Sequence, residues 1–184
     1  MAKYSVTKVK VFEGMEGHGF NATLMRDGRA VATVIDDASG GPTMFNWLDE
    51  RAKLVEFVAL NYKDEPFDRK GTPEEAAFWE HCKSLGKYVY NGQEFHHSPA
   101  YVAETLMVEA TLRKNVAARL KRGMKTKVLF VRDGAEYSVK PKVPGVDPLL
   151  VVGAVAEKYP GATILNTMPF DDAVDLCVKL EAAR

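Results

Sequence analysis

The sequence predicts an α+β fold: an antiparallel amino-terminal sheet packed with helices, followed by a long helix and a β-hairpin-α-β-α unit. Three observations lead to this prediction. Apolar and polar residues alternate with the period of a strand in several short segments. Apolar residues recur at helical spacing in longer segments. Asp-Gly and Asn-Gly pairs, and polar residues followed by proline, stand between them, where turns and helix starts are expected.

The chain has 184 residues, 46% of them hydrophobic, which suits one domain or two small ones with a buried core. We expect a first region, residues 1–97, that holds the antiparallel sheet and two helices. The second region, residues 98–184, is expected to hold the long helix and the β-hairpin-α-β-α unit. No low-complexity linker separates the two regions, so they could equally form one continuous domain.

Residues 8–41 predict three strands joined by two turns. Val9 and Val11 alternate with lysines, and the same period of two continues through the next two runs. Asp27 and Gly28 separate the second run from the third. Both residues tolerate positive φ, so this pair predicts a tight hairpin turn.

The first turn, residues 13–19, contains three glycines. Such a loop could cradle a phosphate, but phosphate loops usually open a helix with a basic residue behind it, and here a strand follows. We therefore expect a mobile or bulged hairpin loop.

The acidic turn over residues 36–42 could bind a divalent cation through Asp36 and Asp37. It lacks the alternating oxygen ligands and distal Glu of a calcium loop, which favours solvated turn carboxylates.

A short strand is expected over residues 43–47, followed by a helix over residues 48–62 that packs across the sheet. The helix is predicted from apolar residues that share one helical face: Leu48, Ala52, Val55, Ala59 and Tyr62. Asp49 and Glu50 would lie in its first turn, where the helix dipole favours acidic side chains. A charged loop over residues 61–71 would end it.

The segment from Thr72 to Glu75 predicts a second helix, with threonine as cap and proline at the first helical position. Gly86 would end this helix. Residues 87–95 predict a small hairpin, because Asn91 and Gly92 form a favoured two-residue turn between aromatic-rich arms.

The second region begins with Ser98 and Pro99, which predict the start of a long helix reaching Arg122. A hairpin is expected over residues 125–140, turning at Asp133 and Gly134. The remaining elements are a helix from Asp147 and Pro148 through Lys158, a short strand over residues 162–166, and a last helix beginning at Pro169 or Phe170.

Composition narrows the classes of function. Basic and acidic side chains number 25 each, so no overall field favours nucleic acid or an anionic membrane. The amino terminus lacks a secretory pattern, and no apolar run reaches the roughly 20 residues of a membrane-spanning helix. We expect no membrane association and a cytoplasmic location. Cys82 and Cys177 are expected to be free thiols acting as small core hydrophobes.

A basic segment is the best sequence candidate for a nucleic-acid surface. Residues 113–132 include eight basic side chains and no acidic one. The candidate contacts within it are Arg113, Lys114, Lys121, Arg122, Lys125 and Lys127. No aromatic residue that could stack on bases lies between the first and last of these, which favours a solvated helix end.

No catalytic or cofactor-binding constellation is evident in the sequence, which favours a protein that is not an enzyme and needs no cofactor. Glu109 could be a buried functional acid, but Arg113 one turn later predicts an ordinary ion pair. Four residues could meet as a zinc site, although they lack ligand spacing: His81, Cys82, His96 and His97. We expect no metal site. An enzyme or small-ligand binder, with a site between the sheet and the long helix, remains an alternative.

Residues 12–41 resemble the start of small proteins encoded by bacteriophages and other mobile elements. The resemblance rests on FEGMEGHGFNATL, which forms an FxGMExxGFNAxL-like strand, followed by a short hairpin and an Asp-rich Gly-Gly turn. It implies an intracellular accessory protein that modifies a host process, such as a defence system. We therefore expect a non-catalytic protein that binds a host protein through its two exposed loops. The candidate contacts are Glu13, Glu16, His18, Asp36 and Asp37. Nucleic-acid binding by the basic segment is the alternative.

Overall fold

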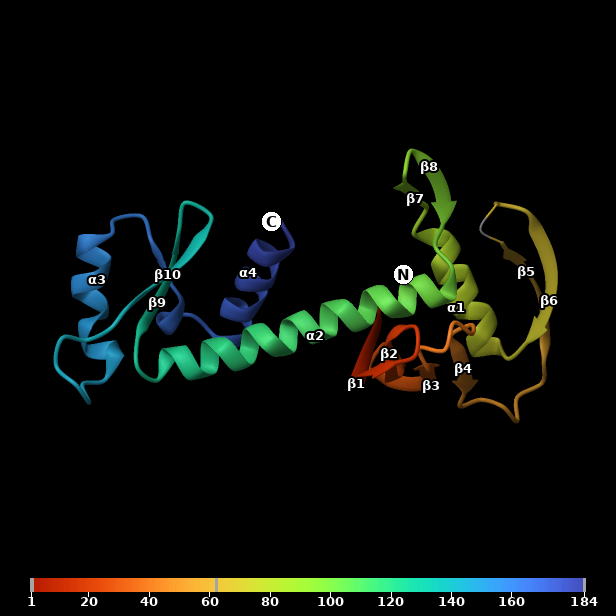
Figure 1. Cartoon of the computed structure of the whole chain (residues 1–184), viewed down its shortest axis with the longest axis horizontal. Helices are drawn as coiled ribbons and strands as arrows, with labels where there is room; N and C mark the ends of the chain where they lie inside the picture. The colour runs from red at the N-terminus through yellow and green to blue at the C-terminus, as the bar shows by residue number, and fades with distance from the viewer. Residues whose placement is uncertain (1, 62, 184) are drawn as a thin grey trace. The chain divides into compact units, whose positions relative to one another are not determined.

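The computed structural model describes residues 2–61 and 63–183 and confirms the α+β prediction (Figure 1). The chain divides into two compact units, residues 1–110 and residues 111–184. The boundary falls inside the long helix α2 (Pro99–Met124), so this helix contributes residues to both units. The predicted helix start is also observed, because the Ser98 hydroxyl accepts a hydrogen bond from the Tyr101 backbone N–H at 3.2 Å.

The amino-terminal unit is built on a four-stranded antiparallel sheet in the order β1-β2-β3-β4. Its strands are β1 (Tyr4–Gly14), β2 (Gly17–Arg26), β3 (Arg29–Asp36) and β4 (Met44–Trp47). Asp27 and Gly28 have φ values of 50° and 80° and close the two-residue turn that the sequence predicted. A bulge in β1 was not predicted: Lys8 has a φ of 53°, and the register shifts between Thr7 and Lys10.

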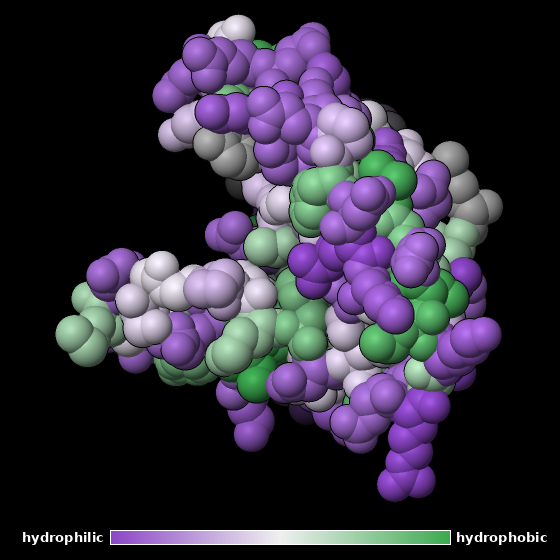
Figure 2. Space-filling view, turned by 90° about the vertical axis from the view of Figure 1, so that its right-hand side faces the viewer, coloured by the Kyte–Doolittle hydropathy of each residue, from purple (hydrophilic) through white to green (hydrophobic). Residues whose placement is uncertain are grey.

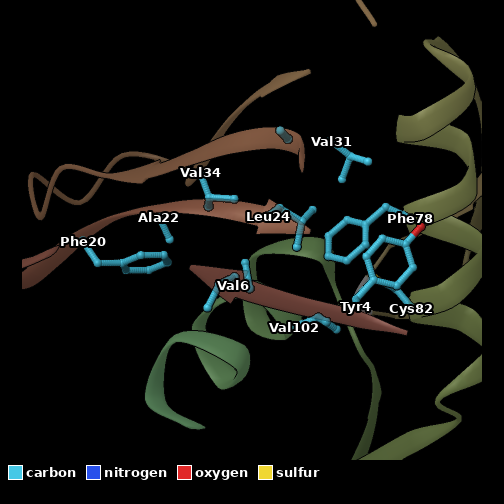
Figure 3. Close-up of a cluster of buried hydrophobic side chains, with 12 residues drawn as sticks. Tyr4, Val6, Phe20, Ala22, Leu24, Val31, Val34, Phe78, Cys82 and Val102 are labelled. Atoms are coloured by element: carbon cyan, nitrogen blue, oxygen red, sulfur yellow. The ribbon is translucent and has the colours of Figure 1, made fainter. Parts of the chain in front are cut away.

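One face of this sheet carries the core of the unit. Figure 3 shows Leu24 of the sheet beside Phe78 of α1 (Pro73–Ser84), and Val6, Cys82 and the α2 residue Val102 belong to the same buried cluster. Leu24 and Phe78 are fully buried. Burial raises the pKa of the Cys82 thiol to about 12. Cys82 and Cys177 are free and buried, which confirms the prediction of core thiols.

The predicted helix over residues 48–62 is wrong. Residues 48–52 form turns, and β5 (Val55–Leu60) pairs with β6 (Pro66–Gly71) as a two-stranded ribbon. The helical spacing competed with the strand preference of the β-branched and aromatic residues in VEFVAL, and the pairing strand decided the outcome. Asn61 shapes the connecting loop, because its side-chain oxygen accepts from the backbone N–H of Glu65 at 3.0 Å. Tyr62 lies outside the described residues.

The ribbon exposes apolar side chains, with Val58 46% and Phe67 38% accessible to solvent. Figure 2 views the right-hand side of Figure 1, where β5 and β6 lie, and shows apolar areas among hydrophilic ones.

The other predicted hairpin is confirmed: β7 (Lys87–Tyr90) and β8 (Gln93–His96) turn at Asn91 and Gly92, whose φ values are 49° and 75°.

The start of α1 is capped as predicted and by one further residue. The Thr72 hydroxyl accepts from the Glu75 backbone N–H at 3.2 Å. The Asp49 carboxylate accepts from the Glu74 backbone N–H at 3.1 Å. Asp49 was expected in the first turn of its own helix and instead caps α1, because residues 48–52 turn toward the start of that helix.

The carboxyl-terminal unit is built around its central strand β9 (Val128–Arg132). This strand is the middle one of a three-stranded sheet in the order β10-β9-β11. Side chains of β9 belong alternately to two clusters, Leu129 and Val131 with α2 and α4, Val128 and Phe130 with α3. The other elements are β10 (Ala135–Val139), the 3₁₀ helix η1 (Pro148–Val151), α3 (Val152–Lys158), β11 (Thr163–Ile164), the 3₁₀ helix η2 (Leu165–Thr167) and α4 (Phe170–Ala182).

The hairpin at Asp133 and Gly134 is confirmed, with φ values of 50° and 73°. Two elements of this unit are shorter than expected. The strand predicted over residues 162–166 has two residues and continues as η2. The helix from Asp147 begins as η1, in which the Asp147 carboxylate accepts from the Leu149 backbone N–H at 2.9 Å.

Candidate interaction surface

The two loops proposed as contacts lie side by side in the amino-terminal unit. The Glu16 backbone N–H donates to the Ala38 carbonyl at 2.9 Å, which ties the β1–β2 turn to the β3–β4 loop. Ala38 is only 6% exposed, although it lies in a loop. We call the outer residues of this joined pair the acidic-loop surface: Glu13, Met15, Glu16, His18 and Asp37.

The β1–β2 turn is tighter than predicted. Residues 13–19 were expected to form a mobile or bulged loop, but β1 runs to Gly14 and β2 starts at Gly17. Glu13 faces His18 as a paired position in the ladder, so both belong to strands. Only Met15 and Glu16 form the turn, because the glycines extend the pairing to its end.

Two of the glycines, Gly14 and Gly19, allow the β1–β2 hairpin and the β3–β4 loop to pack closely. A Cβ at Gly14 would lie 2.6 Å from the Cβ of Ala38, and one at Gly19 would lie 2.7 Å from the ring of Phe12 and closer still to the Asp36 carbonyl. Gly40 has a φ of 77°, and the Glu16 carboxylate lies directly over it. A side chain at Gly14 or Gly19 would force packed neighbours apart, whereas at Gly40 it would displace the flexible Glu16 side chain and strain the backbone at positive φ.

The two aspartates hold the β3–β4 loop in shape. The Asp36 carboxylate accepts from the Ala38 backbone N–H at 3.0 Å and from the Thr43 hydroxyl at 3.3 Å. The Asp37 carboxylate accepts from the backbone N–H of Ser39 at 3.1 Å and from its hydroxyl at 2.6 Å. These two bonds lower the pKa of Asp37 and keep it negatively charged. Asp36 is therefore mainly a structural residue of the surface, whereas Asp37 also exposes charge.

Met15 is the residue of this surface that sequence reasoning missed. Its side chain is 95% exposed at the tip of the β1–β2 turn, between Gly14 and Glu16. A methionine placed between glycines in a predicted turn was the available signal. Its flexible apolar side chain beside carboxylates offers contact area and charge, and methionine adapts readily to a partner's shape.

In the carboxyl-terminal unit, ion pairs neutralise part of the basic segment. Arg113 pairs with Asp175 and, at 3.5 Å, with Asp171. Arg119 pairs with Glu136 at 2.7 Å and with Glu181. Three lysines of the segment remain exposed and form no ion pair within residues 2–61 and 63–183: Lys114, Lys121 and Lys125. Lys127 is half-buried, and Arg122 donates to the Ala118 carbonyl at 3.3 Å.

The expected pair between Glu109 and Arg113 does not form. Glu109 is exposed, and Arg113 bonds instead to the α4 aspartates. The residues considered for zinc take separate roles. His96 lies 3.2 Å from the Asp64 carboxylate, and His81 packs on Tyr4. His97 contacts the rings of Tyr88 and Tyr101, which stack on each other at 4.4 Å between centroids. Among the described residues, no group of three or more His, Cys, Asp or Glu side chains is placed to hold a metal ion.

Comparison of the chain with known protein families, with curated proteins and with solved structures finds no match. In the part of the chain that the structure describes, no helix is long and apolar enough to cross a membrane. The geometry of the acidic-loop surface is therefore what supports a functional proposal.

Proposed function

We propose that this chain is a non-catalytic binding protein that acts by protein–protein contact through the acidic-loop surface. The backbone bond between Glu16 and Ala38 carries the proposal, because it joins two sequence-distant loops into one fixed surface. A surface held in place before binding loses less conformational entropy when a partner docks. The exposed Met15 lies at its tip, and the exposed Glu13, Glu16 and Asp37 give the same surface negative charge.

The chemistry of the surface defines the partner. Met15 suits an apolar depression on the partner, and the carboxylates of Glu13, Glu16 and Asp37 suit arginine or lysine around that depression. The resemblance of residues 12–41 to phage and mobile-element proteins supports a host protein as this partner, in the cytoplasm of the host cell. A protein of a defence system, inhibited by the contact, is one such target.

Affinity capture with matched variants tests the proposal. The tagged chain and a Glu13→Lys, Met15→Asp double variant are used to capture proteins from nuclease-treated bacterial lysate, followed by quantitative mass spectrometry. The control is a Glu157→Lys, Ala156→Asp double variant, which makes the same change of charge at exposed positions of α3. A protein retained by the wild type and control but at least tenfold depleted by the loop variant supports the proposal. Equal retention by all three chains would refute this placement of the site.

One specific observation favours nucleic-acid binding: Lys114, Lys121 and Lys125 are exposed and form no ion pair with any residue that the structure describes. It predicts binding that weakens steeply with salt and with Gln substitution of these lysines. A parallel capture from lysate without nuclease tests this alternative. If only nucleic acid is retained there and nuclease removes it, the surface formed by these lysines takes the place of the acidic-loop surface.

A further inference from the structure

The carboxyl-terminal unit contains an apolar pocket of about 350 Å³. It lies between the end of β10, residues 140–146 and α3. Val139, Val151 and Val155 form its apolar lining with Tyr159, whose ring stacks on Phe130 at 4.9 Å between centroids. The residues that line the pocket on this side also pack in the hydrophobic cluster around Phe130, which holds them in place.

The charged side chains that line this pocket are all basic. Three of its lining residues are lysines, Lys140, Lys142 and Lys158, and none of the lining residues is acidic. In the described part of the chain, none of these lysines forms an ion pair. Lys158 lies over the ring of Tyr159, 5.4 Å from its centroid, which places one ammonium group at the aromatic wall.

We propose that this pocket binds a small amphiphile, free in solution, that carries an apolar chain or ring and one anionic group. The apolar lining would take the chain or ring by the hydrophobic effect. The three lysines would attract the anionic group at the mouth, where a cation would be repelled and a neutral head group would gain no charge pairing. The volume is at the lower end of the range for small-molecule sites, which suits a medium-length ligand.

Isothermal titration calorimetry of the full chain with decanoate, below its micelle-forming concentration, tests the proposal. Decanol and decyltrimethylammonium serve as neutral and cationic probes of the same chain length. Decanoate is expected to bind at least tenfold more tightly than either. Equal affinity for the three probes, no binding of decanoate, or binding only to vesicles of anionic phospholipid would overturn it.

Two pairs of variants place the site. Ala154→Phe fills the pocket and should abolish decanoate binding, whereas Ala156→Phe on the same helix lies outside the lining and should leave it intact. Lys140→Gln, Lys142→Gln and Lys158→Gln together should reduce the affinity for decanoate at least tenfold without changing that for decanol. Gln at Lys114, Lys121 and Lys125 is the matched charge control. Unchanged binding in Ala154→Phe that folds normally, judged by circular dichroism, contradicts the placement.

Discussion

Arg26 and Glu74 form an ion pair with a separation of 3.0 Å that ties the β2–β3 hairpin to the start of α1. Arg29, across the hairpin turn, pairs with the other oxygen of the same carboxylate. The Glu74 side chain is only 11% exposed, so both arginines bond to a largely desolvated group. The hydrogen bond that Arg26 donates to the Glu74 carboxylate raises the pKa of Arg26.

Glu74→Ala is expected to lower the free energy of unfolding by roughly 2 kcal/mol, because two charge-assisted bonds are lost together. Glu80→Ala removes an exposed pair with Lys83 on the same helix and should cost less than about 0.5 kcal/mol. Urea unfolding of both variants measures the difference. Equal stabilities would contradict a structural role for the Glu74 contacts.

Gly19→Ala is expected to destabilise the amino-terminal unit by about 1–3 kcal/mol, since its Cβ would meet the Asp36 carbonyl and the Phe12 ring. Gly153→Ala provides the opposite case. No atom lies within 4 Å of a Cβ there, and the residue is helical, so a gain of about 0.5–1 kcal/mol is expected. Thermal unfolding of the two variants should shift in opposite directions.

Stability should fall as the pH drops below the ordinary histidine pKa of 6.5, with His81 contributing. Burial lowers the pKa of His81 in the folded chain, whereas in the unfolded chain it binds a proton at its ordinary pKa. Its contribution is therefore complete above pH 6.5 and is lost as the pH falls toward the lowered value. Unfolding in urea at pH 7.5 and 5.5 should show a smaller loss of stability for His81→Phe than for wild type. An equal loss in the two proteins would contradict this contribution of His81.

Asn166 connects three backbone groups in the carboxyl-terminal unit. Its side-chain oxygen accepts from the Leu129 N–H at 2.7 Å, and its amide nitrogen donates to the Lys127 carbonyl at 3.0 Å and the Met124 carbonyl at 3.4 Å. Asn166→Ala should cost about 2–3 kcal/mol, because partly buried backbone groups lose their partners. Asn115→Ala, on the exposed side of α2, should change the free energy of unfolding by less than about 0.5 kcal/mol.

Elements defined by adjacent residues could be predicted from the sequence. The turns at Asp27, Asn91 and Asp133 each require positive φ beside a glycine, which is a local property. The Thr72 cap is equally local. The error at residues 48–62 arose because the partner of β5 is supplied by β6, and apolar spacing alone fits a helix as well as a strand.

The candidate site was predictable only in part. Its acidic residues stand out in the sequence, but the bond between Glu16 and Ala38 depends on three strands being in register. The pairing of Arg113 depended on α4, a distant segment, so the nearer Glu109 was the wrong partner. Long-range pairing of this kind is set by tertiary packing, which no local pattern encodes.

The close packing of glycines beneath the acidic-loop surface separates the residues that natural variation can change from those it cannot. Gly14 and Gly19 admit no side chain, so substitution there disturbs the scaffold. Met15 touches little of the protein, so exchanging it alters what the tip presents while the fold remains the same. Under the proposed function, the tip residue could therefore change along with its partner while the supporting glycines stay fixed.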